Sequence, residues 1–251
     1  MASLLHTALR SLLPSARGEF TFESRQLVEL EPPASINLYI HVPFCNSICS
    51  FCPYVKEIYD PLVSAHYQAA VLEELIRYRE QWGRVTVDSV YFGGGTPSPT
   101  PHIIETTTEW ISSHFRLDGC EVGVEVHPVT ACDEVLSSLR RAGVTCVSLG
   151  VQTFNDRLLA ILGRGYAGTE ADEACEQVAQ AGSETVDLDL MFALPTQTLE
   201  EAESDIQTAF GLGVDQVSTY PLIPFSCTPL KSCLNAQGFS LPSQRREKAM
   251  L

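Results

Sequence analysis

Three cysteines on one short segment are the residues whose type and spacing most clearly indicate chemistry. Cys45, Cys49 and Cys52 form a C-x3-C-x2-C triplet in the segment LYIHVPFCNSICSFCP, directly after an apolar run. Three thiolates on one loop can bind a single metal centre from one side. A structural zinc site usually has four protein ligands, and its cysteines commonly come as two close pairs.

The other cysteines do not supply a second close pair of this kind. Four of them stand far apart in the sequence, at Cys120, Cys132, Cys146 and Cys175. Cysteine thiolates also hold iron–sulfur clusters, and a 4Fe–4S cluster held by only three thiolates leaves one iron open to a small molecule. We therefore predict such a cluster on the triplet. Three unligated cysteines, or a zinc ion closed by His41, are the alternatives.

Composition limits the class of protein. The chain has 251 residues, of which 45% are apolar, and this is enough for one α/β domain. Its formal net charge of −15 disfavours a nucleic-acid partner, because phosphates require clustered Lys and Arg. No apolar run reaches the roughly 18 residues that indicate a membrane span. We expect a monomer that acts on a small molecule.

The cysteine count also bears on location. Nine is an odd number, and the triplet takes three, so the sequence indicates a reduced, cytoplasmic protein and not a disulfide framework. Residues 1–18 contain Arg10, Arg17, several leucines and no acidic residue, a pattern that also resembles an organellar transit peptide. An ordinary amphipathic helix at the N-terminus would show the same pattern.

Strand-like and helix-like segments alternate along the chain. Predicted strands cover residues 36–42, 88–92, 121–126, 144–151, 186–194 and 215–222. Predicted helices cover residues 61–82, 102–116, 156–162, 170–180 and 199–212, with one more from a cap at Thr130 to Gly143. This alternation predicts a parallel sheet that is covered on both faces. We divide the chain into a lead-in (1–33), a main domain (34–230) and the start of a truncated C-terminal region (231–251).

Residues with functional side chains fall near the ends of the predicted strands. In parallel α/β sheets, binding sites lie beyond the C-terminal ends of the strands. The features at or near such ends are the cysteine loop, the glycines 93–95, His127, Gln152, Asp189 and Tyr220. We predict that these features converge on one mouth of the sheet.

The cysteine segment resembles a known family. The triplet, Phe51 before its last cysteine and the preceding YIHVPFC are similar to the radical S-adenosylmethionine superfamily, and most to its oxygen-independent coproporphyrinogen III oxidase branch. The resemblance implies a six-stranded partial α/β barrel with parallel strands. It also implies a 4Fe–4S cluster whose open iron binds the amino and carboxylate groups of S-adenosylmethionine. Reductive cleavage of this cofactor gives methionine and a 5′-deoxyadenosyl radical.

Two motifs on the second and third predicted strands fit the resemblance. The segment GGGTP, with Gly94, Gly95 and Thr96, lacks the lysine of a P-loop, and glycines let the backbone approach a ligand closely. The family's GGGTP segment contacts the methionine end of S-adenosylmethionine, whereas a plain turn is the alternative. Glu125 would be costly inside a barrel strand without a hydrogen-bond partner. The family pattern has a cofactor-binding glutamate there; a strand edge in water is the alternative.

Other cofactor contacts follow from the resemblance alone. Gln152 and Arg164, in VSLGVQTFNDRLLAILGRGY, match positions that bind S-adenosylmethionine, and Asp189 in DLDLMFALP matches another. Taken alone, Gln152 could cap the next helix and Arg164 could end a solvated one. Tyr39 and Phe51 match positions that pack against the cofactor.

His41 is the candidate catalytic residue, because it precedes the first cysteine by four residues. It could donate a proton to a substrate or a hydrogen bond to the cluster; a strand-end histidine satisfied within the fold is the alternative. The sequence departs from the branch at two places. Ala193 replaces the glycine of the usual GLP, and Pro53-Tyr54 follows the third cysteine where Gly-Cys is expected.

The resemblance covers residues 36–230 and implies a tetrapyrrole substrate and an electron donor such as a flavodoxin or ferredoxin. Oxidases of this branch continue into a further C-terminal domain, and the segment LPSQRREKAM is similar to its beginning. The reaction could be oxidative decarboxylation of porphyrinogen propionates or attack on a heme macrocycle. A radical methyltransferase of the same branch, and a heme chaperone that delivers heme without turnover, are the alternatives.

Overall fold

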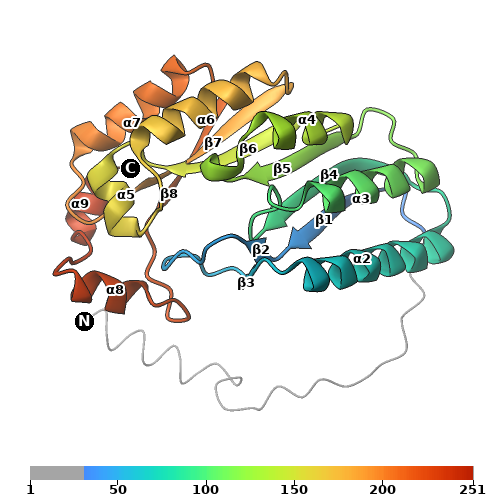
Figure 1. Cartoon of the computed structure of the whole chain (residues 1–251), viewed down its shortest axis with the longest axis horizontal. Helices are drawn as coiled ribbons and strands as arrows, with labels where there is room; N and C mark the ends of the chain where they lie inside the picture. Colours follow the sequence, from blue (N-terminus) through green and yellow to red (C-terminus); the bar gives the residue numbers. More distant parts are fainter. Residues whose placement is uncertain (1–30, 251) are drawn as a thin grey trace, which may run out of the picture. The chain divides into compact units, whose positions relative to one another are not determined.

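A six-stranded parallel sheet forms the centre of the computed structural model, which describes residues 31–250 (Figure 1). The strand order is β1-β4-β5-β6-β7-β8, so β1 and β8 are the edges. The strands are β1 (Ser35–Val42), β4 (Thr86–Gly94), β5 (Glu121–Val126), β6 (Cys146–Gln152), β7 (Thr185–Phe192) and β8 (Gln216–Pro221). Every neighbouring pair is parallel. The predicted α/β fold, a six-stranded partial barrel of parallel strands, is confirmed.

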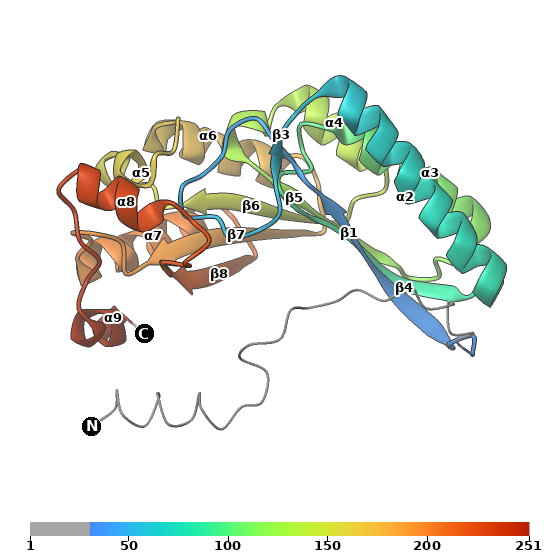
Figure 2. The same cartoon turned by 90° about the horizontal axis from the view of Figure 1, so that it is seen from below.

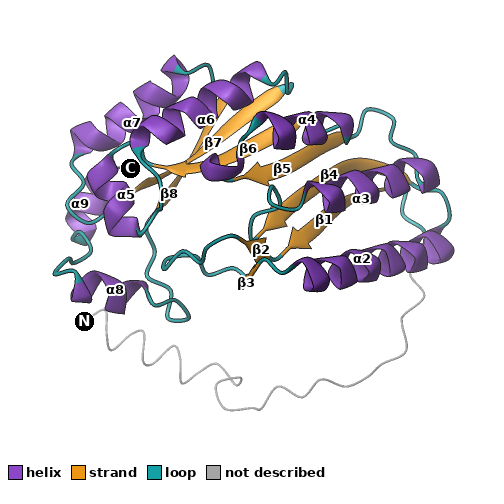
Figure 3. Cartoon of the chain, in the orientation of Figure 1, coloured by secondary structure: helices purple, strands orange, loops and turns teal. Residues whose placement is uncertain are grey.

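Helices connect the strands, and the last two helices follow β8. The helices are α2 (Pro61–Trp82), α3 (Pro101–His114), α4 (Asp133–Arg141), α5 (Asp156–Leu162), α6 (Gly168–Gln180), α7 (Leu199–Gly211), α8 (Leu230–Ala236) and α9 (Gln244–Met250). Figures 2 and 3 show α2, α3, α4 and α6 on the same side of the sheet. Within residues 31–250, no helix combines the length and apolar composition needed to cross a bilayer.

Local sequence explains where the long helix α2 begins and ends. The side chain of Asp60 accepts hydrogen bonds from the backbone N–H groups of Leu62 and Val63, at 2.8 and 3.0 Å. Gly83 ends the helix with a φ of +70°, which a residue without a Cβ adopts readily. The predicted helix over residues 61–82 is therefore confirmed to the residue.

Side chains alternate between the two faces of each strand. In β7, Val186, Leu188 and Leu190 are buried in the core beneath the helices, whereas Asp187 and Asp189 lie on the opposite face and are partly exposed. The prediction that both faces of the sheet are covered is therefore wrong for the inner face. That face carries polar side chains because it borders a cavity.

Two local predictions need correction. Thr130 does not cap the helix that follows, because it lies in a short 3-10 turn, Pro128–Thr130, and its hydroxyl donates to the carbonyl of His127 at 2.8 Å. Helix α4 begins after Cys132 instead. The fourth strand begins two residues later than predicted, at Cys146 and not residue 144. The predicted transit-like segment, residues 1–18, lies outside the described residues.

A second, two-stranded sheet was not predicted from the sequence. Strand β2 (Phe44–Cys45) pairs with β3 (Glu57–Ile58) in parallel. The N–H of Glu57 donates to the carbonyl of Pro43 at 2.8 Å, and the N–H of Tyr59 donates to the carbonyl of Cys45 at 3.0 Å. These bonds close the cysteine loop at its base, so the loop leaves and returns at the same place beside β1.

Candidate cofactor-binding site

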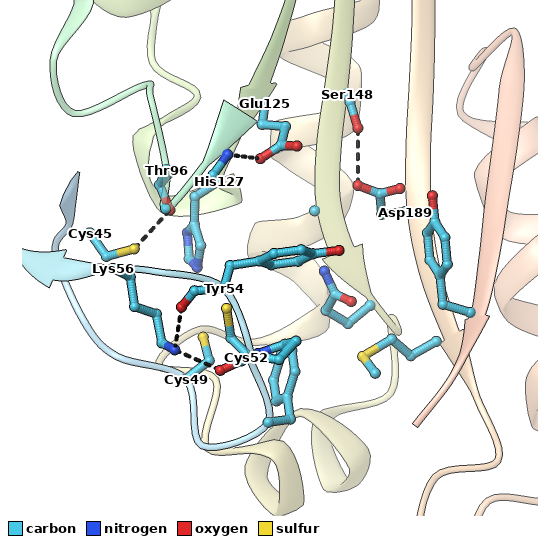
Figure 4. Close-up of a pocket in the computed structure, with 18 of the residues that line it drawn as sticks. Cys45, Cys49, Cys52, Tyr54, Lys56, Thr96, Glu125, His127, Ser148 and Asp189 are labelled. Carbon is cyan, nitrogen blue, oxygen red and sulfur yellow. Dashed lines mark hydrogen bonds between the residues drawn. The ribbon is translucent and has the colours of Figure 1, made fainter. Parts of the chain in front are cut away.

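A cavity of about 400 Å³ opens at the C-terminal ends of the strands. This volume falls in the range of ordinary small-molecule sites. Figure 4 shows the three cysteines on one side of the cavity and Glu125, Ser148 and Asp189 across from them. The predicted site residues that line it are Cys45, Cys49, Phe51, Cys52, Gly94, Gly95, Thr96, Glu125, Gln152, Arg164 and Asp189. The structure therefore confirms that the predicted strand ends converge on one cavity.

The cysteine loop is ordered by backbone contacts and not by disulfides, since all nine cysteines are free. The ammonium group of Lys56 donates to the carbonyl oxygens of Cys52 and Tyr54, at 2.6 and 3.2 Å. Thr96, from the glycine segment, donates its hydroxyl to the sulfur of Cys45 at 3.6 Å. The thiols thus face the cavity from a loop that the rest of the fold keeps in place.

The donor set fits a cluster better than a single ion. Within residues 31–250, no three His, Cys, Asp or Glu side chains converge as the ligands of one ion would. A cluster differs, because each of its cysteines binds a different iron. The guanidinium of Arg164 donates to the sulfur of Cys49 at 3.2 Å and has no carboxylate partner among the described residues. A cation so placed fits an anionic centre on the cysteines.

His41 does not point at the cysteines. Its Nε2 lies 2.8 Å from the carbonyl oxygen of Val55, and its Nδ1 lies 3.2 Å from the hydroxyl of Tyr39. This geometry gives no support to a zinc ion closed by His41. Tyr39 is 59% exposed and stacks on Tyr91 with ring centroids 6.3 Å apart. Neither His41 nor Tyr39 lines the cavity.

The glycine segment has a role that the sequence did not predict. A Cβ added at Gly94, whose φ is +118°, would lie 2.6 Å from the ring of His41. One added at Gly95 would lie 2.6 Å from the carbonyl group of Pro43. The N–H of Gly95 also donates to the carbonyl of Val42 at 2.8 Å. The glycines therefore also let β4 approach the chain that leads into Cys45, and the contact of this segment with a ligand stays a prediction.

Glu125 receives its hydrogen bond from this same segment. Its carboxylate accepts the N–H of Gly94 at 3.0 Å. Burial raises the pKa of Glu125, the Gly94 bond opposes the rise, and the nearby charge of Asp189 adds to it. A carboxylate held at a cavity wall in this way keeps free lone pairs for a ligand's hydroxyl or ammonium group.

Asp189 lies across the cavity on β7. It accepts a hydrogen bond from the hydroxyl of Ser148 at 3.0 Å. Burial raises its pKa to about 6; the Ser148 bond opposes this rise, and the charge of Asp187 adds to it. The ionised form of Asp189 is therefore disfavoured in the folded protein until a ligand supplies a partner.

We expect Asp189→Asn to stabilise the protein without cofactors at about pH 8, and to do so less near pH 5. The folded pKa of about 6 lies above the unperturbed 3.8. As the pH rises from 3.8 to about 6, the ionisation of Asp189 therefore lowers the free energy of unfolding. Above about pH 6 this loss of stability stays constant. Because Asp189 is partly exposed, we expect the substitution to raise the free energy of unfolding at pH 8 by only about 1 kcal/mol. Urea unfolding of wild type, Asp189→Asn and the exposed control Asp118→Asn measures this, and a gain that does not depend on pH would contradict it.

Two further residues that line the cavity are His127, which was predicted at the mouth of the sheet but given no role, and Tyr54, which was not predicted there. His127 accepts the N–H of Val129 on its Nδ1 at 3.2 Å, and its ring meets Tyr166 edge to face at 5.4 Å. Burial lowers the pKa of His127 to about 3, and Arg164 adds to this effect, so the imidazole is neutral. Tyr54, which is 65% exposed, also lines the cavity. The departure at Pro53-Tyr54 was the sequence signal that could have identified it.

The fold and the site together define a class: a parallel partial barrel whose first strand leads into a three-cysteine loop at a small-molecule cavity. The sequence model of the Radical SAM superfamily matches residues 39–209, which is more than half of the chain. The chain belongs to the radical S-adenosylmethionine superfamily, whose members use a 4Fe–4S cluster and S-adenosylmethionine.

The names of curated relatives come from heme and porphyrin biochemistry. The chain is 34% identical over 215 residues to a protein named heme chaperone HemW from Bacillus subtilis, covering 84% of this chain and 57% of that one. It is 30% identical over 202 residues to the oxygen-independent coproporphyrinogen III oxidase of Bradyrhizobium diazoefficiens, covering 78% and 45%. The chain thus spans about half the length of these relatives.

A solved structure has a similar fold. Coproporphyrinogen III oxidase (HemN) from Escherichia coli superposes with a TM-score of 0.75 over 89% of this chain and 51% of that one. The two sequences are 23% identical, so this likeness supports the fold alone.

Proposed function

We propose that the chain binds a 4Fe–4S cluster through Cys45, Cys49 and Cys52 and S-adenosylmethionine in the adjoining cavity. When bound, these groups supply the electron and the sulfonium whose cleavage gives a 5′-deoxyadenosyl radical. The observation that carries the proposal is that a single cavity is lined both by the three thiols and by polar side chains from the ends of β5, β6 and β7. The protein's part is to orient the cofactors and exclude water.

The side chains around the cavity suit the parts of S-adenosylmethionine. Glu125 and Asp189 offer carboxylate acceptors for ribose hydroxyls or the ammonium group, and each is already positioned by a neutral donor. Arg164 offers a cation beside Cys49, where an anionic carboxylate would meet it. Gln152 offers both an amide donor and an acceptor. Phe51 supplies an apolar wall.

The substrate we propose is a tetrapyrrole. Apolar side chains at the cavity mouth are exposed: Tyr220 at 51%, Ile223 at 47% and Phe225 at 43%. An exposed aromatic rim suits the flat face of a large conjugated ring. The electron donor we propose is a flavodoxin or ferredoxin. A proton-donating role for His41 stays a prediction, since both of its ring nitrogens have partners within the chain.

A heme chaperone of the same fold is the second candidate. The 34% identity to HemW favours it over the oxidase, to which the identity is 30%. The cavity lining also holds three acidic side chains, Glu125, Asp187 and Asp189, against the cations Lys56 and Arg164. This balance disfavours a substrate that carries many carboxylates, such as a porphyrinogen, relative to heme.

Incubation with a reductant, S-adenosylmethionine and heme or a porphyrinogen separates the two candidates. We expect the anaerobically reconstituted chain to form 5′-deoxyadenosine and to alter the tetrapyrrole, with Cys49→Ala as the inactive control. Heme that binds and is recovered unchanged, without deoxyadenosine, would favour the chaperone. Neither heme binding nor deoxyadenosine formation would contradict both candidates.

A further inference from the structure

Gln152 has an unusual backbone conformation for a residue with a side chain. Its φ is +73°, in the left-handed region that disfavours residues with a Cβ. The pairing of β6 with β7 shifts register at the same place, between Gly150 and Gln152. Gln152 also lines the cavity. Strained conformations persist only where surrounding structure enforces them, and they concentrate at functional sites.

A buried carboxylate fixes the two residues that follow Gln152. Asp205 accepts the hydroxyl hydrogen of Thr153 at 2.7 Å with one oxygen and the N–H of Phe154 at 2.9 Å with the other. Asp205 is 5% exposed and Thr153 is fully buried. No cation among the described residues pairs with Asp205. A buried carboxylate is costly without such bonds, so both oxygens are committed to this turn.

The two residues before Gln152 are fixed from the other side. The guanidinium of Arg164 donates to the carbonyl of Gly150 at 2.6 Å. The hydroxyl of Tyr166 donates to the carbonyl of Val151 at 2.7 Å. Side chains therefore bind the two residues on either side of Gln152, and within residues 150–154 only Gln152 has a positive φ.

Asp205 acts from outside the cavity. It lies on α7, one turn beyond the capping residues Thr198 and Glu201, and it is not among the residues that line the cofactor cavity. The Asp205 carboxylate therefore cannot contact a ligand in the cofactor cavity. Its effect on the site must pass through Thr153 and Phe154 to the position of Gln152.

We propose that Asp205 is a positioning residue for S-adenosylmethionine, which fixes the turn after β6 so that Gln152 presents its amide to the cofactor. The inference rests on the proposed function, in which Gln152 contacts that cofactor. An amide donates and accepts at once, so it recognises a hydroxyl or an amino-acid group only when its direction is fixed.

The test measures S-adenosylmethionine binding to the reconstituted full chain by equilibrium dialysis. We expect Asp205→Asn to weaken binding roughly tenfold, the scale of one lost hydrogen bond to a charged group. The iron content should stay at the wild-type level. Thr153→Val replaces the hydroxyl with a methyl group of similar size, and we expect it also to weaken binding. Hydrogen exchange at the Phe154 amide, measured without S-adenosylmethionine, should be faster in Asp205→Asn.

A double-mutant cycle separates positioning from general destabilisation. In a Gln152→Ala background, Asp205→Asn should cause no further loss of affinity, because the side chain that it positions is gone. Asp215→Asn is the control, since the exposed Asp215 also accepts a backbone N–H, that of Val186 at 2.9 Å, but at the end of β7 away from the cavity. We expect that control to bind S-adenosylmethionine normally.

The outcomes that overturn the inference are distinct from those that overturn the proposed function. Wild-type affinity in Asp205→Asn, or equal losses with and without Gln152, would overturn the positioning role alone. A wild-type chain that holds its cluster but does not bind S-adenosylmethionine would overturn the proposed function, and this inference with it.

Discussion

Replacement of Cys45, Cys49 or Cys52 by alanine is expected to abolish cluster binding, whereas Cys146→Ala is expected to retain it. The three thiols line one cavity, and each would hold a different iron, so the loss of any one leaves too few ligands. Cys146 lies at the start of β6, at the other end of the sheet, and does not line the cavity. Cys146→Ala is therefore the control, because it removes a partly exposed thiol of the same fold that would hold no iron.

The measurement is iron and sulfide content after anaerobic reconstitution and removal of unbound metal. We expect about four irons and four sulfides per wild-type chain, and close to none in the three variants. Circular dichroism checks that each variant is folded. A wild-type chain that recovers zinc alone, or a Cys49→Ala variant that keeps its iron, would show that the triplet does not hold a cluster.

Gly95→Ala is expected to destabilise the protein and to impair cluster binding together. Its new Cβ would lie 2.6 Å from the backbone carbonyl of Pro43, so the chain just before Cys45 must move. The N–H of Gly95 donates to the carbonyl of Val42 at 2.8 Å, and the N–H of Thr96 to that of Phe44 at 2.8 Å. Inserting a methyl group into a packed contact typically costs about 1–3 kcal/mol of stability. Here the inserted group would displace the backbone that leads into the cysteine loop.

Gly165→Ala is the matched control, because no other atom lies within 4 Å of the Cβ it would add. We expect a lower melting temperature and a lower iron content for Gly95→Ala, and wild-type values for Gly165→Ala. Wild-type iron content in Gly95→Ala would show that the cysteine loop does not depend on its close contact with the glycine segment.

The sequence was sufficient where a local pattern determines the outcome. The cysteine spacing identified the loop, and the alternation of strands and helices identified a parallel sheet whose ends meet. Gln152, Glu125 and Asp189 were predicted at or near the C-terminal ends of their strands, and all three line the cavity. The resemblance added the cofactors, and the match to the superfamily supports them.

Features that depend on distant contacts could not be predicted. The glycine segment approaches Pro43 and His41, and no local pattern reveals which distant chain a glycine will meet. Asp205 is one acidic residue among several on an amphipathic helix. Its bonds to Thr153 and Phe154 join residues about 50 positions apart in the chain.

The departure at Ala193 has a physical explanation in the structure. Its φ is +57°, so alanine here adopts the left-handed conformation that glycine adopts without strain. The resemblance implies that relatives place glycine at this position. Alanine at this position therefore carries a cost in conformational strain.

The most direct test of the central claim is the electron paramagnetic resonance spectrum of the reduced cluster with and without S-adenosylmethionine. Three cysteine ligands leave one iron open, and the claim is that S-adenosylmethionine binds there. We predict that saturating S-adenosylmethionine changes the spectrum of the wild-type chain. An unchanged spectrum, in protein shown to hold about four irons per chain, would contradict the account.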